Sequence, residues 1–239
     1  MGRVLVVNLL FTFLVLAFLG TSFVAQFSLP LAGLLLFILF FLLIIYLGMA
    51  ASYIKELNDF KAPEIKSLFK NIKSTWKSSL LGGVVFSAVL FFTVLGMRFY
   101  LSLDGILGIM GAIFLFWIFV TVSLASLYYF PVVNRLNSTF MKMMKKSFLI
   151  FLDNPFLTIF VFIGIIINLC LSVFTIFLIP GPAGVLIWID NNLRLLIYKY
   201  DYLEENPDAR RNIPWRALFL EDNEKIGPRS FRNTLFPWK

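Results

Sequence analysis

The chain has 239 residues, of which 60% are apolar and 14% are charged. Soluble domains are about 45–50% apolar and about 25% charged, so this composition indicates an integral membrane protein. It excludes a disordered chain and a collagen-like repeat. The absence of histidine excludes histidine bases and histidine-ligated metals, and the one cysteine, Cys170, cannot form an internal disulfide or a thiolate zinc site.

The spacing of charged residues predicts where the chain crosses the bilayer. Arg3 and Lys55 enclose an uncharged run long enough for two helices of about 20 residues each, with a break at Ser28-Leu29-Pro30. The first helix is too apolar over too great a length for a signal peptide, so we expect it to be retained. The sixth helix must continue through Asp190. We therefore expect an all-α polytopic protein, a six-helix transmembrane bundle with cytoplasmic amphipathic helices. The expected spans are 4–27, 31–53, 78–99, 105–133, 155–179 and 183–198.

Lysine and arginine are distributed to one side of this arrangement. Of the 21 Lys and Arg residues, all but Arg98 fall on the side that holds both termini. Because cytoplasmic loops carry the excess of positive charge, we expect both termini to be cytoplasmic. The turns near Leu29, Leu103 and Gly181 are then expected to face outward. The net charge of +8 reflects membrane insertion in this interpretation, and we expect no nucleic-acid partner.

Two cytoplasmic segments, 63–77 and 140–151, are amphipathic and basic. Apolar residues recur in each at helical spacing beside a row of lysines. Each segment is either an interfacial helix that binds anionic headgroups or an extension of the neighbouring span. The two segments serve either to anchor the chain to the membrane or to dock a partner protein. The candidate interface residues here are Lys66, Lys70, Lys73, Trp76, Lys142, Lys145 and Lys146.

Residues 199–239 form the expected cytoplasmic tail. The tail has mixed charge and several prolines, but it holds too many large aromatic residues for a solvated disordered segment. We expect it to pack on the bundle, on the membrane surface or on another protein, and the sequence leaves these alternatives open. Its candidate interface residues are Trp215, Phe231, Phe236 and Trp238.

The sixth expected span carries the densest polar cluster, and intramembrane polar groups are candidates for function because they are costly to bury. Asp190 and Arg194 are four residues apart and can pair on one helix face. A structural pair that locks the last helix to the bundle competes with a solute or proton site. The candidate site is Asp190, Asn191, Asn192 and Arg194. A single amide in the first span, Asn8, is expected to bond a neighbouring helix.

Three features of the chain resemble a known family. Residues 68–82 run from a basic and aromatic stretch into a span, residues 128–133 form a Tyr-Tyr-Phe-Pro exit, and Lys145-Lys146-Ser147-Phe148 follows. With the order of spans and loops, these stretches resemble the YesL-like small bacterial integral membrane proteins, a family of unknown function. The family's Leu-Pro-x-x-Thr-x-Gly-Pro-Ala stretch is kept only at its start, in residues 29–33, and the aromatic tail is not a family hallmark. Family members are often encoded beside carbohydrate uptake systems, so the resemblance implies the bacterial cytoplasmic (inner) membrane and an accessory role in sugar transport.

These features favour a non-enzymatic accessory or scaffold subunit of a bacterial transport system. Its expected partners are the lipid bilayer with anionic headgroups and another membrane protein or transporter subunit, and we expect no cofactor, metal or catalytic residue. The alternative is a small-solute transporter or channel that uses the polar cluster of the last span. A third class is a membrane enzyme that acts on lipid-linked substrates. Its catalytic acids would have to be the acidic residues of the tail, but these residues are more simply explained as a solvated acidic cluster.

Overall fold

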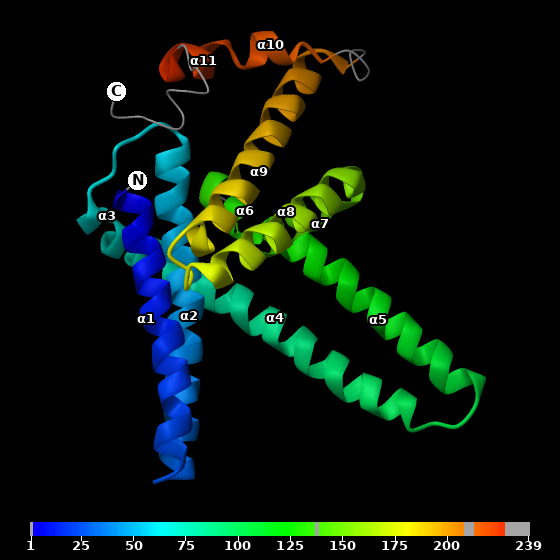
Figure 1. Cartoon of the computed structure of the whole chain (residues 1–239). Helices are drawn as coiled ribbons and strands as arrows, with labels where there is room; N and C mark the ends of the chain where they lie inside the picture. Colours follow the sequence, from blue (N-terminus) through cyan, green and yellow to red (C-terminus); the bar gives the residue numbers. More distant parts are fainter. Residues whose placement is uncertain (1, 137–138, 208–212, 228–239) are drawn as a thin grey trace. The chain divides into compact units, whose positions relative to one another are not determined.

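A computed structural model describes residues 2–136, 139–207 and 213–227 of the chain, and these residues contain helices and no strands. Figure 1 follows the helices in chain order from α1 in blue to α11 in red. They form two compact units that divide within α9, between Leu193 and Arg194. The helices are α1 (Gly2–Ala25), α2 (Leu29–Asn58), α3 (Ile65–Lys70), α4 (Ile72–Leu101), α5 (Ile106–Ser126), α6 (Tyr129–Arg135), α7 (Phe140–Asp153), α8 (Pro155–Phe174), α9 (Gly181–Glu205), α10 (Trp215–Leu218) and α11 (Leu220–Ile226).

Five helical stretches of the described chain are long and apolar enough to cross a membrane, which suggests a multi-pass membrane protein. They are α1, α2, α4, α5 continued into α6, and α8. The predicted break between the first two spans is confirmed, because α1 ends at Ala25 and the Ser28 hydroxyl accepts the Leu31 N–H at the start of α2. The expected sixth span falls in α9, which is not among the five because charged side chains follow from Asp190 onward.

In the first unit consecutive long helices are neighbours: α1 packs on α2, α2 on α4, and α4 on α5. The largest core cluster lies along the C-terminal half of α2, around Met49, Ala50 and Ile54. Helices α2 and α4 approach closely, since a side chain on Gly83 would collide with that of Ile44. This core cluster therefore lies at one end of α2.

The two basic segments behave differently. The first is divided at Asn71, which ends α3 and precedes α4, so a single interfacial helix over 63–77 is wrong. Its second half is the N-terminal extension of α4, as the alternative predicted. Leu68 is buried in the core because α3 packs against α2. The second segment forms one amphipathic helix, α7, which buries Met143, Ser147 and Ile150.

The turn between α8 and α9 is held by α1. Asn8 is fully buried, and its amide Nδ2 donates to the carbonyls of Leu178 (2.7 Å) and Pro180 (2.9 Å). The N–H of Ala183 donates to Asn8 Oδ1 at 2.9 Å. Gly181, which faces Asn8, has φ +61°, a conformation that glycine adopts without strain. Because Ala183 belongs to the first turn of α9, the prediction that Asn8 bonds a neighbouring helix is confirmed, and its two bonds to the turn are additional.

This contact fixes the end of the bundle at which the turn lies. Asn8 is about 26 Å from Ala25 along α1 at 1.5 Å per residue, and the α1–α2 turn near Leu29 follows Ala25. The turns near Gly181 and Leu29 thus lie at different levels along α1, whereas the sequence predicts that both face the same side of the membrane. The distribution of charge does not indicate the level of the turn at Gly181, because that turn contains no charged residue.

The other end of α8 lies at the same level. The hydroxyls of Thr158 and Tyr128 are 3.0 Å apart, at the C-terminal end of α5. The next residue, Tyr129, donates to the Ser78 carbonyl near the start of α4 (2.6 Å). Thr158 near the start of α8 and the turn that follows α8 are therefore both bonded to the end of the hairpins where α1 and α4 begin and α5 ends.

Replacing Asn8 by alanine is expected to destabilise the chain. The change leaves the Ala183 N–H and two carbonyls without their buried partner, and an unsatisfied buried group costs about 1–3 kcal/mol. The measurement is the free energy of unfolding in detergent micelles. Asn191→Ala is the matched control, since Asn191 is exposed and its loss should change stability by less than about 0.5 kcal/mol. Equal effects of the two changes would contradict the role of Asn8.

Candidate functional site: a buried ion-pair cluster

Four polar residues from three helices meet in the first unit, and we call them the ion-pair cluster: Asn58, Asp59, Arg135 and Asp190. Asn58 is the last residue of α2, and Asp59 follows it as the C-cap. Arg135 is the last residue of α6, and Asp190 lies in α9. The cluster therefore joins α2, α6 and α9 at one point.

Arg135 and Asp190 form a two-point contact. Arg135 Nε donates to Asp190 Oδ1 at 2.8 Å and Nη2 donates to Oδ2 at 2.6 Å. Asn58 Nδ2 donates to Asp190 Oδ2 at 2.7 Å, and Arg135 Nη1 donates to Asp59 Oδ1 at 3.0 Å. Both oxygens of Asp190 are thus occupied by donors.

Burial explains why the partners are arranged in this way. Asp190 is 3% exposed, and the Arg135 side chain is 10% exposed. A buried carboxylate is tolerated only when it is paired and hydrogen-bonded. The planar guanidinium satisfies two carboxylates at once because its donors point in fixed directions. The charged groups of the cluster are bonded to one another. This arrangement suits a contact that joins helices better than a site that binds a solute.

A backbone contact positions Arg135. Lys55 of α2 donates from Nζ to the carbonyl of Asn134 at 2.6 Å. This bond ties the end of α6 to α2 one residue before the arginine. The cation of Lys55 also lies near a cluster that otherwise has two acids and one base.

The prediction that Asp190 pairs with Arg194 is wrong, because each residue has another partner. Asp190 binds Arg135, and Arg194 belongs to the second unit, where Nη2 donates to Asp222 Oδ1 at 2.5 Å and Nε donates to the Tyr198 hydroxyl at 2.8 Å. Spacing of four residues permits a pair on one helix, but a partner on another helix offers better geometry to a long arginine. Burial raises the pKa of Tyr198 above its ordinary value, and the adjacent Arg194 opposes that rise.

The two amides of the predicted site have separate environments. Asn191 is exposed. Asn192 is 5% exposed and donates to the Trp188 carbonyl one turn earlier at 2.8 Å. The four predicted polar residues therefore do not converge on one site.

Three members of the cluster were missed by sequence reasoning: Asn58, Asp59 and Arg135. They lie at the ends of predicted helices, where charged and amide residues are ordinary. The one usable signal was that a buried Asp190 requires a cation, and the cytoplasmic side offers many. Nothing in the local pattern distinguishes Arg135 from the other lysines and arginines on that side.

The candidate interface residues occupy several helices. Those of the first basic segment and α7 are exposed, apart from the half-buried Lys146. Trp76 is 41% exposed. In the second unit, Trp215 stacks on Phe219 with ring centroids 5.9 Å apart. The remaining candidates, Phe231, Phe236 and Trp238, lie outside the described residues.

Among the residues that the structure describes, no group of three or more Cys, Asp or Glu side chains is placed to hold a metal ion. Comparisons with protein families, curated proteins and solved structures find no match to this chain.

Removing the cation of the ion-pair cluster is expected to be strongly destabilising. Arg135→Gln leaves Asp190 buried without its counterion, and breaking a buried pair in this way costs about 3–5 kcal/mol. The double replacement Arg135→Leu with Asp190→Leu should cost less than Arg135→Gln alone, because it leaves no unpaired charge on Asp190. Unfolding free energies in detergent measure both effects.

Arg98 provides the matched control, because it is an exposed arginine at the end of α4. Arg98→Gln should change the unfolding free energy by less than about 0.5 kcal/mol. If Arg135→Gln behaved like Arg98→Gln, the cluster would not stabilise the fold.

Proposed function

We propose that the chain is a multi-pass protein of the bacterial cytoplasmic membrane that acts as an accessory or scaffold subunit of a transport system. Its cytoplasmic surface would bind the partner. The resemblance to the YesL-like proteins supports transport, with carbohydrate uptake as the class of system. The closed contacts of the ion-pair cluster favour this role over transport by the chain itself.

Four crossings, not six, fit the contacts of the first unit. The crossing helices would be α1, α2, α4 and α5. Helix α8 is apolar enough to lie in the membrane, but Thr158 near its start and the turn after its end bond to the same end of the hairpins. We infer that α8 stays at the cytoplasmic side of the bilayer and that α9 begins there. An even number of crossings is retained, so both termini remain cytoplasmic and the distribution of Lys and Arg is unchanged.

Helix length supports a position of the ion-pair cluster beyond the hydrocarbon. Helix α2 has 30 residues and is about 45 Å long, whereas the hydrocarbon core is about 30 Å thick. The end of α2 that projects would be the polar one, which carries Lys55 and Asn58. Asp190 bonds Asn58, so it would lie at the projecting end. A charge there avoids the cost of the bilayer centre.

The functional proposal rests on the contrast between charged groups that are paired inside the protein and charged groups that are exposed on its surface. Asp190 has both oxygens occupied, whereas Lys66, Lys70 and Lys73 are exposed on neighbouring turns of α3 and α4. Exposed cations beside aromatic side chains such as Trp76 suit a protein interface. The rival class, a small-solute transporter, would need a polar group open to a pathway.

The four-crossing topology predicts the side from which the Gly181 turn is labelled. In a Cys170→Ser background, single cysteines replace Phe27, Ser102, Lys61 or Ile179, all exposed positions. A membrane-impermeant maleimide on intact cells should label positions 27 and 102 only. Inverted vesicles should label positions 61 and 179. Labelling of position 179 from outside would restore six crossings.

The accessory role predicts a partner that depends on the first basic segment. Purification from native membranes in mild detergent should yield a second transport subunit in fixed ratio to this chain. Replacing Lys66, Lys70 and Lys73 by Gln should lower its recovery about tenfold, equivalent to about 1.4 kcal/mol of binding free energy. Quantitative mass spectrometry measures the ratio.

The control variant replaces Lys61, Lys77 and Lys225, which are exposed lysines outside the candidate interface. Its recovery of the subunit should match that of the unmodified chain. The account fails if the chain purifies alone, or if the reconstituted chain by itself transports a solute and loses that transport in Asp190→Asn with the fold intact.

A further inference from the structure

An open groove lies in the first unit where α1, α2 and the junction of α3 with α4 meet. It consists of two adjoining hollows of about 290 Å³ and about 490 Å³, which share Ile45, Phe69 and Ile72. The first hollow is completed by one face of α1 and one face of α2, at helical spacing: Leu10, Phe13, Leu14, Leu42, Tyr46 and Met49. Lys73 and Trp76 of α4 complete the second. We call the two hollows together the Lys73 groove.

Buried contacts hold the junction of α3 with α4 beside α2 and so shape the groove. Leu68, which precedes Phe69, is buried in the core, and Asn71 Nδ2 donates to Glu56 Oε1 of α2 at 3.1 Å. Phe69 and Trp76 nevertheless stay 54% and 41% exposed. One side of the junction is thus fixed to the protein, while the groove presents exposed apolar surface, which marks a binding surface.

The polar groups of the groove can only donate hydrogen bonds. The Tyr46 hydroxyl is already donated to the Val7 carbonyl at 3.1 Å. Lys73 is exposed, and no described residue accepts a hydrogen bond from its ammonium. The indole N–H of Trp76 is a second donor, and neither side chain has an acceptor. The groove therefore suits an apolar occupant whose polar end is an anionic acceptor.

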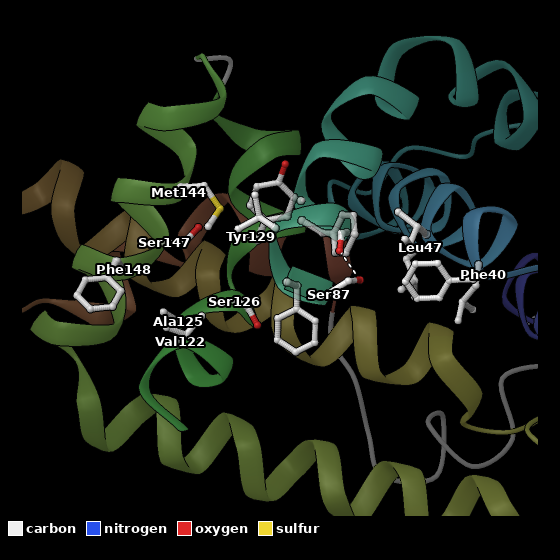
Figure 2. Close-up of a pocket in the computed structure, with 17 residues that line it drawn as sticks. Phe40, Leu47, Ser87, Val122, Ala125, Ser126, Tyr129, Met144, Ser147 and Phe148 are labelled. Atoms are coloured by element: carbon white, nitrogen blue, oxygen red, sulfur yellow. Dashed lines mark hydrogen bonds between the residues drawn. The ribbon is translucent and has the colours of Figure 1, made fainter. Parts of the chain in front are cut away.

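The cavity in Figure 2 lacks this combination. It has a volume of about 390 Å³ and lies between α2, α4, α5, α6 and α7. None of the described residues that line it is charged. Its hydroxyls donate to backbone carbonyls, as Ser87 does to Gly83 at 2.7 Å. An apolar lining alone does not identify an occupant, so we assign none to that cavity.

The position and length of the groove fit one leaflet of the bilayer. Leu42 and Met49 are seven residues apart, which is about 10 Å along α2. Hydrocarbon about 30 Å thick contains two leaflets, so each acyl chain spans about 15 Å. Lys73 is the second residue of α4, and α4 begins at the cytoplasmic end of the hairpins in the proposed topology. The ammonium would thus lie at the level of the phosphates, where tryptophan side chains such as Trp76 are also enriched.

We propose that the Lys73 groove binds one membrane phospholipid, with an acyl chain against α1 and α2 and its phosphate on the Lys73 ammonium. The apolar faces select the chain, and the donors select the phosphate. The bound headgroup would then form part of the candidate interface around Lys66 and Lys70. The site depends on the proposed membrane topology but not on the accessory role.

The test counts lipid retained by the full chain. The chain is moved from nanodiscs of phosphatidylglycerol into mild detergent, and native mass spectrometry reads the bound lipids. One retained phosphatidylglycerol per chain is expected, and diacylglycerol, which has the chains but no phosphate, should not replace it. Lys73→Gln should weaken retention about fivefold. Lys61→Gln removes the same charge from an exposed lysine outside the groove and should leave retention unchanged.

A second variant fills the groove. Leu42 lines it and is 46% exposed, whereas Leu36 of the same helix is 44% exposed and lies outside both hollows. Leu42→Trp should lose the bound phospholipid, and Leu36→Trp should keep it. If Leu42→Trp does not fold, the comparison of Lys73→Gln with Lys61→Gln still decides the matter.

Three results would overturn the proposal: equal retention by the two lysine variants, full retention by a folded Leu42→Trp chain, or diacylglycerol held as tightly as phosphatidylglycerol. The lipid is counted on this chain itself, so a failure of the accessory role would not change the count.

Discussion

The buried carboxylate of Asp190 is the constraint on which the arrangement of the first unit depends. A carboxylate that is 3% exposed requires a cation and hydrogen-bond donors, and here Arg135 and Asn58 supply them. These partners come from α6 and α2, so satisfying one charge joins three helices. The same contacts leave Asp190 without an open oxygen, which separates a structural role for this acid from a transport role.

A second constraint comes from the bilayer. Hydrocarbon about 30 Å thick tolerates the apolar parts of α1, α2, α4 and α5, and it repels the polar end of α2. The bonds of Asn8 to the turn before α9 then have a simple consequence. In the proposed topology they place the start of α9 near the cytoplasmic border, so that Asp190, about 14 Å further along the helix, lies outside the hydrocarbon.

Much of the fold could be predicted from single-sequence patterns. Charge spacing located the helices of the first two hairpins, because a crossing helix needs a long uncharged run, and the Ser28-Leu29-Pro30 break was found from turn chemistry. Helix α7 followed from its amphipathic period. The division of the first basic segment at Asn71 was not predicted, since its apolar stripe continues at helical spacing across α3 and α4. The partner of Asp190 was also missed, because Arg135 is far from it in the chain. The position of α8 could not be inferred, because composition alone does not show at which side a helix ends.

The central claim is that the ion-pair cluster lies outside the hydrocarbon, and the depth of Asn191 measures it most directly. Asn191 is exposed beside Asp190, so a nitroxide label there samples the surroundings of the cluster. In reconstituted bilayers, collision rates with a water-soluble nickel complex and with oxygen report depth. The account predicts high nickel and low oxygen accessibility for position 191, and the reverse for a label at Leu34, which faces away from the core of α2. An oxygen-rich, nickel-poor environment at position 191 would place the cluster inside the membrane and contradict the account.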